Sequence, residues 1–186
     1  MTELATAHTI DTDVVLRRLL DESEIRAVLA RYARGIDRRD MDIVRSCYHP
    51  DATDAHGQYN GDVEGFIQNS IARWTGKSES MTHHFGQSLI EIDGDNAWVE
   101  SYCLCYIRLK PEEEGGKPLD RLGNIRYVDL FERRNGEWLI AHRKVVHHPG
   151  RLDTVEIDPP LAEQAFRARS DRDDPSYDRR PESFLP

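Results

Sequence analysis

The chain has 186 residues, enough for one domain with a hydrophobic core but with little room for a second. Its formal net charge is −9 and its basic residues are interspersed with acidic ones, which argues against nucleic acid and anionic membranes as partners. No apolar run approaches the ~18 residues that a membrane span needs, and the N-terminus lacks the features of a signal peptide. The sequence therefore predicts a cytoplasmic protein with no membrane contact.

The first half of the chain is predicted to be mainly helical, because its apolar residues recur at helical spacing. Asp21 is expected to cap the main helix, with Glu24 three residues later, and Asp40 is expected to cap the next helix. The predicted segments in this half are helices at 13–20, 22–38, 41–48 and 63–74, and a short extended piece near 52–57.

From residue 80 onward the apolar period changes to two, which is typical of strands. Residues 93–96 and 134–137 contain Asp-Gly and Asn-Gly pairs that predict hairpin turns. The predicted strands are 80–92, 96–110, 121–134 and 137–148. Helices followed by antiparallel strands indicate an α+β domain over residues 1–150, with the helices on one face of the sheet. Residues 151–186, rich in Pro, Asp and Arg, are predicted to form a tail that is extended or wrapped on a neighbouring subunit.

The segment 96–110 is apolar on both faces of the predicted strand. A sheet that is covered by helices on one side and meets water on the other should not be apolar on both. One face is therefore expected to line the core or a pocket, and the other to contact another subunit in a homo-oligomer. A single domain with a further layer behind the sheet is the alternative. The first face carries Val99, Cys103, Cys105, Ile107 and Leu109, and the second carries Trp98, Tyr102, Leu104 and Tyr106.

Asp37 is unusual because it lies near the end of the predicted 22–38 helix, where the helix dipole disfavours a negative charge. Tyr32 lies five residues earlier, so both side chains can lean toward one cavity. The competing interpretation is a surface carboxylate that is paired with one of the nearby arginines, Arg34, Arg38 or Arg39.

His83 and His84 lie near the start of the strand predicted at 80–92. By strict alternation His84 shares a face with Gly86, Ser88 and Ile90, which suits the floor of a cavity, whereas His83 lies on the opposite face. A strand histidine can also be purely structural.

Motifs for cofactors and metals are not apparent in the sequence. There is no Cys-x-x-Cys pair, no glycine-rich phosphate loop and no His-Glu-x-x-His motif, so no cofactor is expected. The cluster His49, Asp51, Asp54 and His56 invites a metal interpretation, but no matching ligand group accompanies it elsewhere, so no metal is expected either. The three cysteines fit buried thiols in a reducing compartment.

The order of these features resembles the scytalone dehydratase and SnoaL-like family, which includes bile-acid 7α-dehydratase and hexachlorocyclohexane dehydrochlorinase. The residues that carry the resemblance are Tyr32 and Asp37 late in a helix, Thr82-His83-His84-Phe85-Gly86 opening a strand, and the segment 126–143 with its Gly136-Glu137-Trp138. The resemblance covers about residues 13–148. It implies the nuclear-transport-factor-2-like fold, a cone-shaped barrel of a strongly bent mixed sheet wrapped by N-terminal helices. It also implies a homo-oligomer, a trimer or else a dimer.

In that family an aspartate and a histidine that face each other in the pocket do the chemistry. The resemblance assigns these roles to Asp37 and His84, with Tyr32 as a third catalytic residue. It also implies that the substrate-binding residues include His56, Cys105, Ile107, Tyr127 and Arg143. The chain departs from scytalone dehydratase at the polar residues that bind its substrate, near His56, Leu109, Ile125 and Tyr127, so the substrate is not expected to be scytalone.

The function implied is a cofactor-independent lyase, most simply a dehydratase, acting on a small apolar molecule that contains a ring. His84 is expected to be the base that removes a proton from carbon, and Asp37 to hold its other ring nitrogen. A cyclase or isomerase that uses the same pocket begins with the same step. A third possibility is a ligand- or protein-binding module of the same fold without catalytic activity.

Overall fold

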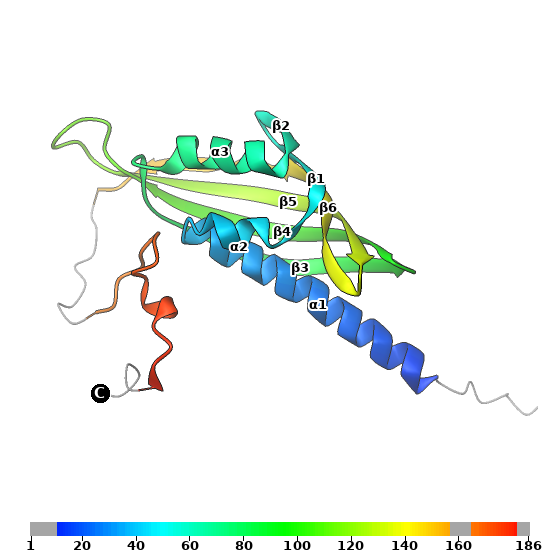
Figure 1. Cartoon of the computed structure of the whole chain (residues 1–186). Helices are drawn as coiled ribbons and strands as arrows, with labels where there is room; N and C mark the ends of the chain where they lie inside the picture. Colours follow the sequence, from blue (N-terminus) through cyan, green and yellow to red (C-terminus); the bar gives the residue numbers. More distant parts are fainter. Residues whose placement is uncertain (1–10, 157–164, 182–186) are drawn as a thin grey trace, which may run out of the picture.

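The computed structural model describes residues 11–156 and 165–181 of the chain (Figure 1). Its elements are α1 (Thr12–Asp37), α2 (Met41–Arg45), β1 (Tyr48–His56), β2 (Tyr59–Asp62), α3 (Val63–Trp74), β3 (Ser78–Asp93), β4 (Asn96–Leu109), β5 (Leu119–Arg134), β6 (Glu137–His147), β7 (Arg151–Thr154) and a 3₁₀ turn at Pro175–Tyr177. The four long strands agree with the predicted ones to within two residues at each end. None of the described helices is both long enough and apolar enough to cross a membrane.

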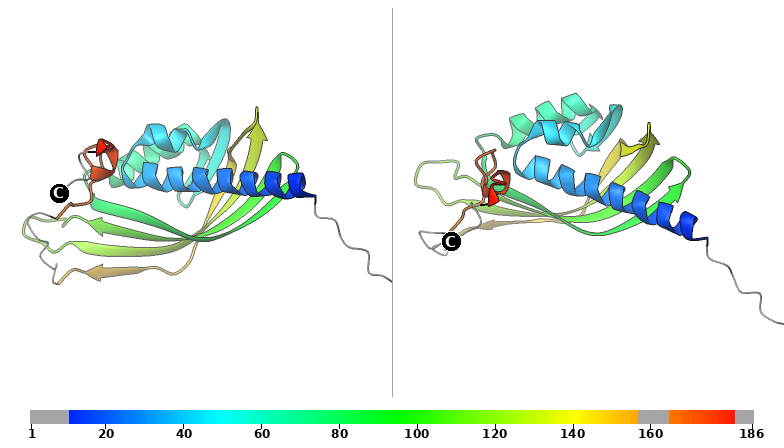
Figure 2. Two further views of the ribbon diagram at one scale, coloured as in Figure 1. Left: turned by 90° about the horizontal axis from the view of Figure 1, so that it is seen from below. Right: turned by 60° about the horizontal axis from the view of Figure 1, so that its bottom comes forward.

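The strands form one curled sheet that does not close on itself, in the order β2-β1-β6-β5-β4-β3. The sheet is mixed because β1 runs parallel to β6, while the other neighbours are antiparallel, and β7 pairs with the beginning of β5. All three helices lie on one side of the sheet (Figure 2). The predicted α+β class, with helices covering a bent mixed sheet, is thereby confirmed.

The first helix is continuous, so the prediction of two helices separated at Asp21 is wrong. Asp11, not Asp21, caps α1, through hydrogen bonds from the backbone N–H groups of Asp13 and Val14. Asp21 lies in the middle of the helix and is buried, where it accepts hydrogen bonds from Trp138 Nε1 (3.0 Å) and Arg133 Nη1 (2.9 Å). A carboxylate that resembled a cap in sequence therefore anchors the helix to the β5–β6 hairpin.

The predicted hairpin turns are present, and their backbone angles explain their residues. Gly94 adopts φ 59°, and Asn135 and Gly136 adopt φ 54° and 85°. These left-handed conformations favour Gly and Asn, and two-residue turns of this kind match the twist of the flanking strands. Short turns therefore set the register of the β3–β4 and β5–β6 hairpins, whereas residues 110–118 connect β4 to β5.

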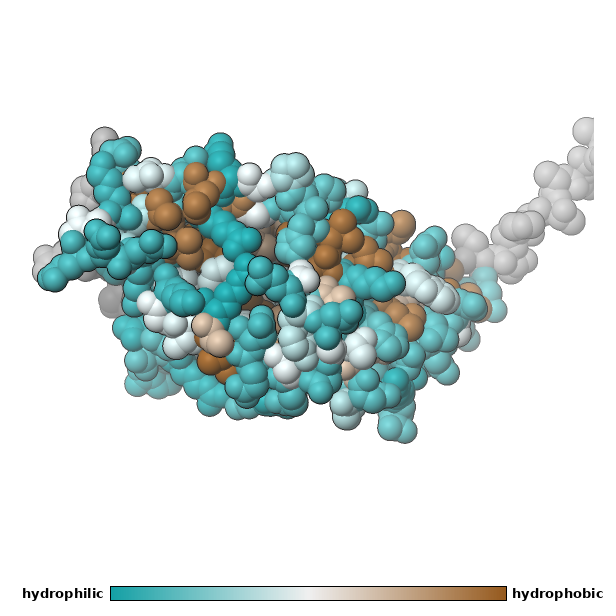
Figure 3. Space-filling view, turned by 90° about the horizontal axis from the view of Figure 1, so that it is seen from above, coloured by the Kyte–Doolittle hydropathy of each residue, from teal (hydrophilic) through white to brown (hydrophobic). Residues whose placement is uncertain are grey.

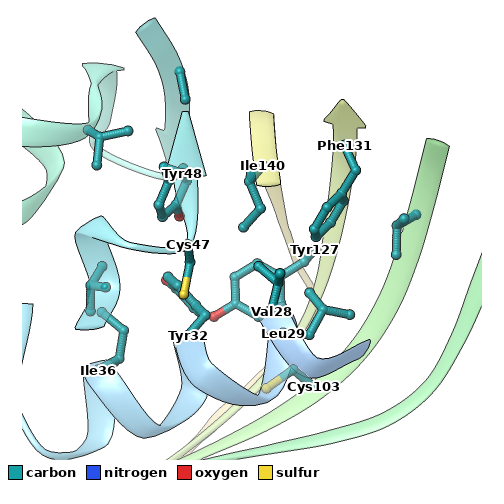
Figure 4. Close-up of a cluster of buried hydrophobic side chains, with 14 of the residues drawn as sticks. Val28, Leu29, Tyr32, Ile36, Cys47, Tyr48, Cys103, Tyr127, Phe131 and Ile140 are labelled. Atoms are coloured by element: carbon teal, nitrogen blue, oxygen red, sulfur yellow. The ribbon is translucent and has the colours of Figure 1, made fainter. Parts of the chain in front are cut away.

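The hydrophobic core lies between the helices and the inner face of the sheet. Tyr32 of α1 lies between Tyr48 of β1 and Tyr127 of β5, with ring centroids 6.1 and 5.7 Å apart and the rings edge to face (Figure 4). Such aromatic pairs contribute about 0.5–1.5 kcal/mol beyond the burial of their area. They join α1 to two separate strands of the sheet, β1 and β5.

The outer face of the sheet carries exposed apolar side chains, as the pattern of residues 96–110 predicts. In β4, Trp98, Tyr102 and Leu104 are 52%, 41% and 49% exposed, and Leu89 of β3 and Val128 of β5 accompany them. The first turns of α1, which extend past the sheet in Figure 1, also expose apolar side chains. In the view over α3 and β2, by contrast, hydrophobic residues surface only in separate patches among hydrophilic ones (Figure 3).

The described residues after 149 pack against their own chain. Beyond β7, residues 165–181 contact the α1–α2 junction, where Arg172 and Tyr177 both bind the Asp40 carboxylate. Asp40 directly precedes α2, as predicted, but its side chain accepts no capping hydrogen bond from a helix amide. It instead binds residues 165–181 through Arg172 and Tyr177. α2 also ends at Arg45, three residues before the predicted end, because β1 begins at Tyr48.

Candidate functional site

A cavity of about 610 Å³ opens between the helices and the inner face of the sheet. Its wall is formed by α1, α3, the inner faces of β3, β4 and β5, and the residues from His147 to Leu152. Apolar side chains such as Phe66, Met81 and Ile107 contribute much of the wall. A volume of this size suits a small organic molecule.

Asp37 and His83 form the central polar contact beside this cavity. His83 Nδ1 lies 2.7 Å from Asp37 Oδ1, and the backbone N–H of His83 donates to Asp37 Oδ2 over 3.1 Å. Both side chains are nearly buried, at 9% and 11% exposure, and His83 lines the cavity. The two hydrogen bonds offset the unfavourable position of a carboxylate at the C-terminus of α1. Asp37 is thus a buried partner of a histidine, and the interpretation as a surface carboxylate paired with an arginine is wrong.

The prediction that His84 faces Asp37 is wrong. His84 is exposed and pairs with Leu104 on the outer face, whereas His83 pairs with Cys105 on the inner face. The physical reason is a β-bulge: Phe85 pairs with Cys103 and the next pair joins Ser88 with Ser101, so β3 advances three residues where β4 advances two. One extra residue reverses the alternation of faces between the two halves of the strand.

The sequence contained one signal of this bulge. Gly86 lies in the interior of the strand, and an isolated glycine in a strand commonly marks a bulge. Beyond the bulge the predicted alternation holds, since Ile90 is buried and Ser88 hydrogen-bonds inner-face Ser101. Strict alternation, extended back across Gly86, selected the wrong histidine.

Tyr32, the predicted third residue, lines the same cavity as His83. Its side chain is 1% exposed. Burial raises the pKa of Tyr32 above its usual range, with the carboxylate of Asp54 acting in the same direction and the Arg143 guanidinium opposing it. The phenol therefore keeps its proton at neutral pH and is available as a hydrogen-bond donor.

Cys105 and Ile107 line the cavity, whereas Tyr127 and Arg143 lie behind its wall. Arg143 makes a two-pronged ion pair with Asp129, at 2.8 and 2.7 Å, and both side chains are fully buried. Its guanidinium also lies 4.1 and 4.2 Å from the ring centroids of Tyr32 and Tyr127. The structure thus places Arg143 in support of the aromatic wall and out of reach of a ligand in the cavity.

His56 lines the cavity as part of a second aspartate–histidine pair that sequence reasoning missed. Its Nδ1 lies 3.2 Å from Asp54 Oδ1, and its ring stacks on Phe66 at 4.8 Å. Asp54 is completely buried and also accepts a hydrogen bond from Tyr48 over 2.7 Å. The Asp-x-His spacing on one strand was the available signal, because residues two apart share a face.

The four residues considered as metal ligands do not form one group. His49 bonds the backbone oxygen of Glu132, Asp51 pairs with Arg134, and Asp54 binds Tyr48 and His56. Within residues 11–156 and 165–181, no three His, Cys, Asp or Glu side chains are grouped so that they could hold a metal ion.

Comparisons with known proteins identify the family and the fold of the chain. The model of the SnoaL-like domain matches residues 17–144. No curated protein sequence matches the chain. A type 2 hexachlorocyclohexane dehydrochlorinase has a similar structure, with a TM-score of 0.67 at 20% identity over 78% of this chain and 97% of that one.

Two further solved structures are similar in the same way. The type 3 hexachlorocyclohexane dehydrochlorinase from Novosphingobium barchaimii gives a TM-score of 0.64 at 20% identity, covering 78% of this chain and 99% of that one. A candidate scytalone dehydratase from Novosphingobium aromaticivorans gives 0.64 at 14% identity, covering 80% and 97%. At these identities the similarity shows the fold, and the nuclear-transport-factor-2-like architecture is confirmed.

Proposed function

The chain belongs to the SnoaL-like domain family, and on that premise we propose that it is a cofactor-independent lyase. Its substrate is a small apolar molecule that contains a ring, and the reaction eliminates water or another small group. The observation that carries this proposal is the Asp37–His83 pair, a carboxylate hydrogen-bonded to one nitrogen of an imidazole whose ring lines the cavity. A base oriented by a buried carboxylate is the arrangement that proton abstraction requires.

His83 is the base in this proposal. With Nδ1–H donated to Asp37, the lone pair of Nε2 is free to accept a proton from a carbon beside a carbonyl or a leaving group. As the imidazolium forms, the Asp37 carboxylate stabilises its charge. Expulsion of the leaving group then forms the double bond, and the proton on His83 is returned to solvent or to the leaving oxygen.

Tyr32 is the donor in this proposal. It lines the cavity from α1, and its raised pKa keeps the phenolic proton in place, so it can donate to a developing oxyanion or to the leaving oxygen. No step needs a group beyond these side chains. The alternative products, from cyclisation or isomerisation, arise from the same carbanion and are separated by analysis of the product.

The test measures proton abstraction directly. A panel of cyclic ketones and β-hydroxy ketones is incubated with the protein in D₂O, and deuterium at carbon and loss of water are followed by NMR and mass spectrometry. We expect His83→Ala to lower the rate by about 10² or more, since positioned acid–base groups contribute about that much.

His84→Ala is the matched control, because it removes the same side chain one residue away on the outer face. It should leave the rate nearly unchanged. Equal rates in His83→Ala and wild type would show that His83 is not the base. Binding of panel members without exchange or turnover in any variant would instead favour a ligand-binding module.

A further inference from the structure

The wall of the cavity differs in charge from the chain as a whole. The chain has 34 Asp and Glu against 25 Lys and Arg. Among the described residues that line the cavity, however, there are three arginines and four histidines but no Asp or Glu: Arg73, Arg121, Arg151, His56, His83, His147 and His148. Asp37 and Asp54 bind two of these histidines from behind and do not form part of the wall. The cavity therefore favours negative charge although the protein itself is acidic.

Two of these arginines have no carboxylate partner. Arg73 and Arg121 lie 4.8 and 5.7 Å from the ring centroid of Trp74, and neither forms an ion pair with an acidic residue in the part of the chain that the structure describes. Arg151, at the same end, differs because it pairs with Asp153 at 2.6 Å. Contact with an aromatic face stabilises a guanidinium but leaves its positive charge in place.

The pKa shifts of Arg73 and His147 agree with an excess of positive charge at this end of the cavity. Burial lowers the pKa of Arg73, and the nearby guanidinium of Arg121 lowers it further. Burial also lowers the pKa of His147, with His56, Arg121 and Arg73 acting in the same direction. An anion placed between the two guanidiniums would relieve this repulsion and accept charge-assisted hydrogen bonds from both.

The position of the pair suits one end of a ligand whose other end reaches His83. β4 lies between the strands that carry the two residues. Arg121 of β5 pairs with Ile107 of β4, and His83 of β3 pairs with Cys105 of β4. The backbones of Arg121 and His83 are therefore two strand spacings apart across the sheet and two residues apart along it, a separation of roughly 12 Å. The wall between them includes Ile107 and Ile125, which suit the apolar body of a ligand.

We propose that the ligand of this cavity is an apolar molecule that carries a carboxylate or phosphate group, and that Arg73 and Arg121 bind this group. The inference rests on the proposed function only in taking the cavity as the substrate site. It narrows the substrate class from apolar ring compounds in general to anionic ones.

The experiment compares the affinity of three probes that share one ring system: 2-naphthoate, 2-naphthyl phosphate and the neutral 2-naphthylmethanol. Titration calorimetry on the full chain should show at least one anion binding about tenfold or more tightly than the alcohol, as charge-assisted hydrogen bonds predict. This preference should shrink as KCl is raised. The tighter anion identifies the source of the charge as a carboxylate or a phosphate ester.

In the double variant Arg73→Gln/Arg121→Gln, the anions should lose about tenfold or more in affinity, while the alcohol changes by less than about twofold. The double variant Arg26→Gln/Arg45→Gln is the control, since it removes two positive charges from helix surfaces outside the cavity wall. It should bind all three probes as wild type does.

Wild-type protein that binds neither anion more tightly than the alcohol, or binds no probe at all, overturns the proposal without any variant. So does an unchanged affinity for the anions in the folded Arg73→Gln/Arg121→Gln protein. His83→Ala should keep the preference for anions, because the base is separate from the anion site. Failure of the proposed catalysis is thereby distinguished from failure of this inference.

Discussion

The carboxylate of Asp37 accepts two hydrogen bonds from a single residue, His83: one from Nδ1 over 2.7 Å and one from the backbone N–H over 3.1 Å. The pair therefore fixes both the ring and the strand that carries it. Rotation of the imidazole is restricted, and the end of α1 is tied to β3. An acid–base pair held in this way has its geometry before any ligand binds.

Asp37→Asn tests the role of the charge in this pair. The amide retains the size of the side chain but removes the negative charge that stabilises the imidazolium, and it can favour the wrong tautomer of His83. We expect turnover to fall by about 10² or more. The melting temperature should change little, because an anion at a helix C-terminus is locally unfavourable. Wild-type turnover in folded Asp37→Asn would contradict the assigned role.

Arg143→Met tests whether Arg143 supports the wall or binds the ligand. The substitution leaves the Asp129 carboxylate buried without its partner, and breaking such a pair costs roughly 3–5 kcal/mol. Burial already raises the pKa of Asp129 against the effect of Arg143, so the carboxyl should become protonated in the variant. Urea unfolding gives the free energy of unfolding.

Arg134→Met is the control for this prediction, since Arg134 pairs with Asp51 and Glu132 at the surface. A surface pair of this kind contributes about 0–1 kcal/mol. Equal destabilisation in the two variants would show that the buried pair does not have the role assigned to it.

The outer face of the sheet predicts a homo-oligomer, a trimer if the chain assembles as the dehydratases that it resembles. The apolar side chains of β4, 41% exposed or more, would be covered by another subunit. Light scattering at micromolar concentration should give a multiple of the mass of the chain, and Leu104→Glu should shift it toward the monomer. Gln68→Glu adds the same charge on the exposed side of α3 and should have no effect. A monomeric wild type would exclude this use of the face.

The contact of residues 165–181 with the helices should depend on pH through Asp174. Burial acts to raise the pKa of this carboxyl, but hydrogen bonds from Arg169 and Ser176 and the charge of Arg38 outweigh it and hold the pKa well below its usual range. A carboxyl with a lowered pKa in the folded state adds stability above its unfolded pKa of about 3.9, and this stability is lost as the pH falls further.

We therefore expect Asp174→Asn to reduce the hydrogen-exchange protection of this segment at pH 6, and the difference from wild type to shrink progressively as the pH falls below about 3.9. The loss at pH 6 should correspond to about 1–3 kcal/mol, as for hydrogen bonds to a charged group. Asp173→Asn is the control, because the side chain of Asp173 is 81% exposed. A difference that is constant across this pH range would contradict the role of the charge.

Much of the fold could be predicted from local patterns. The period-two segments and the Gly and Asn turns gave the four long strands because each strand buries one face and each turn needs a positive φ. The break in α1 was predicted wrongly because the burial of Asp21 depends on Trp138 and Arg133, more than 100 residues away. β7 was missed because its four residues are all exposed and carry no apolar alternation.

The candidate site could be predicted only in part. Asp37 and Tyr32 were found because helical spacing places them without reference to distant residues. The choice between His83 and His84 needed the pairing of β3 with β4, which residue types alone do not specify once a bulge is present. Arg143 was misplaced because the resemblance implies its place on the last long strand but not that Tyr32 and Tyr127 separate it from the cavity.

The bulge at 86–87 also shows what decides between two chemically identical side chains. On one side of it Met81 and Phe85 turn inward, and on the other side Ser88 and Ile90 do so. A one-residue shift of this part of β3 would turn His84 inward, but it would also expose Met81 and Phe85. Burial of a large apolar side chain is worth about 1.5–3 kcal/mol, so the shift would cost stability of that order for each side chain. The choice of which imidazole faces the cavity thus depends on the burial of the apolar side chains beside it. Deletion of Gln87 should accordingly lower the melting temperature as well as the activity.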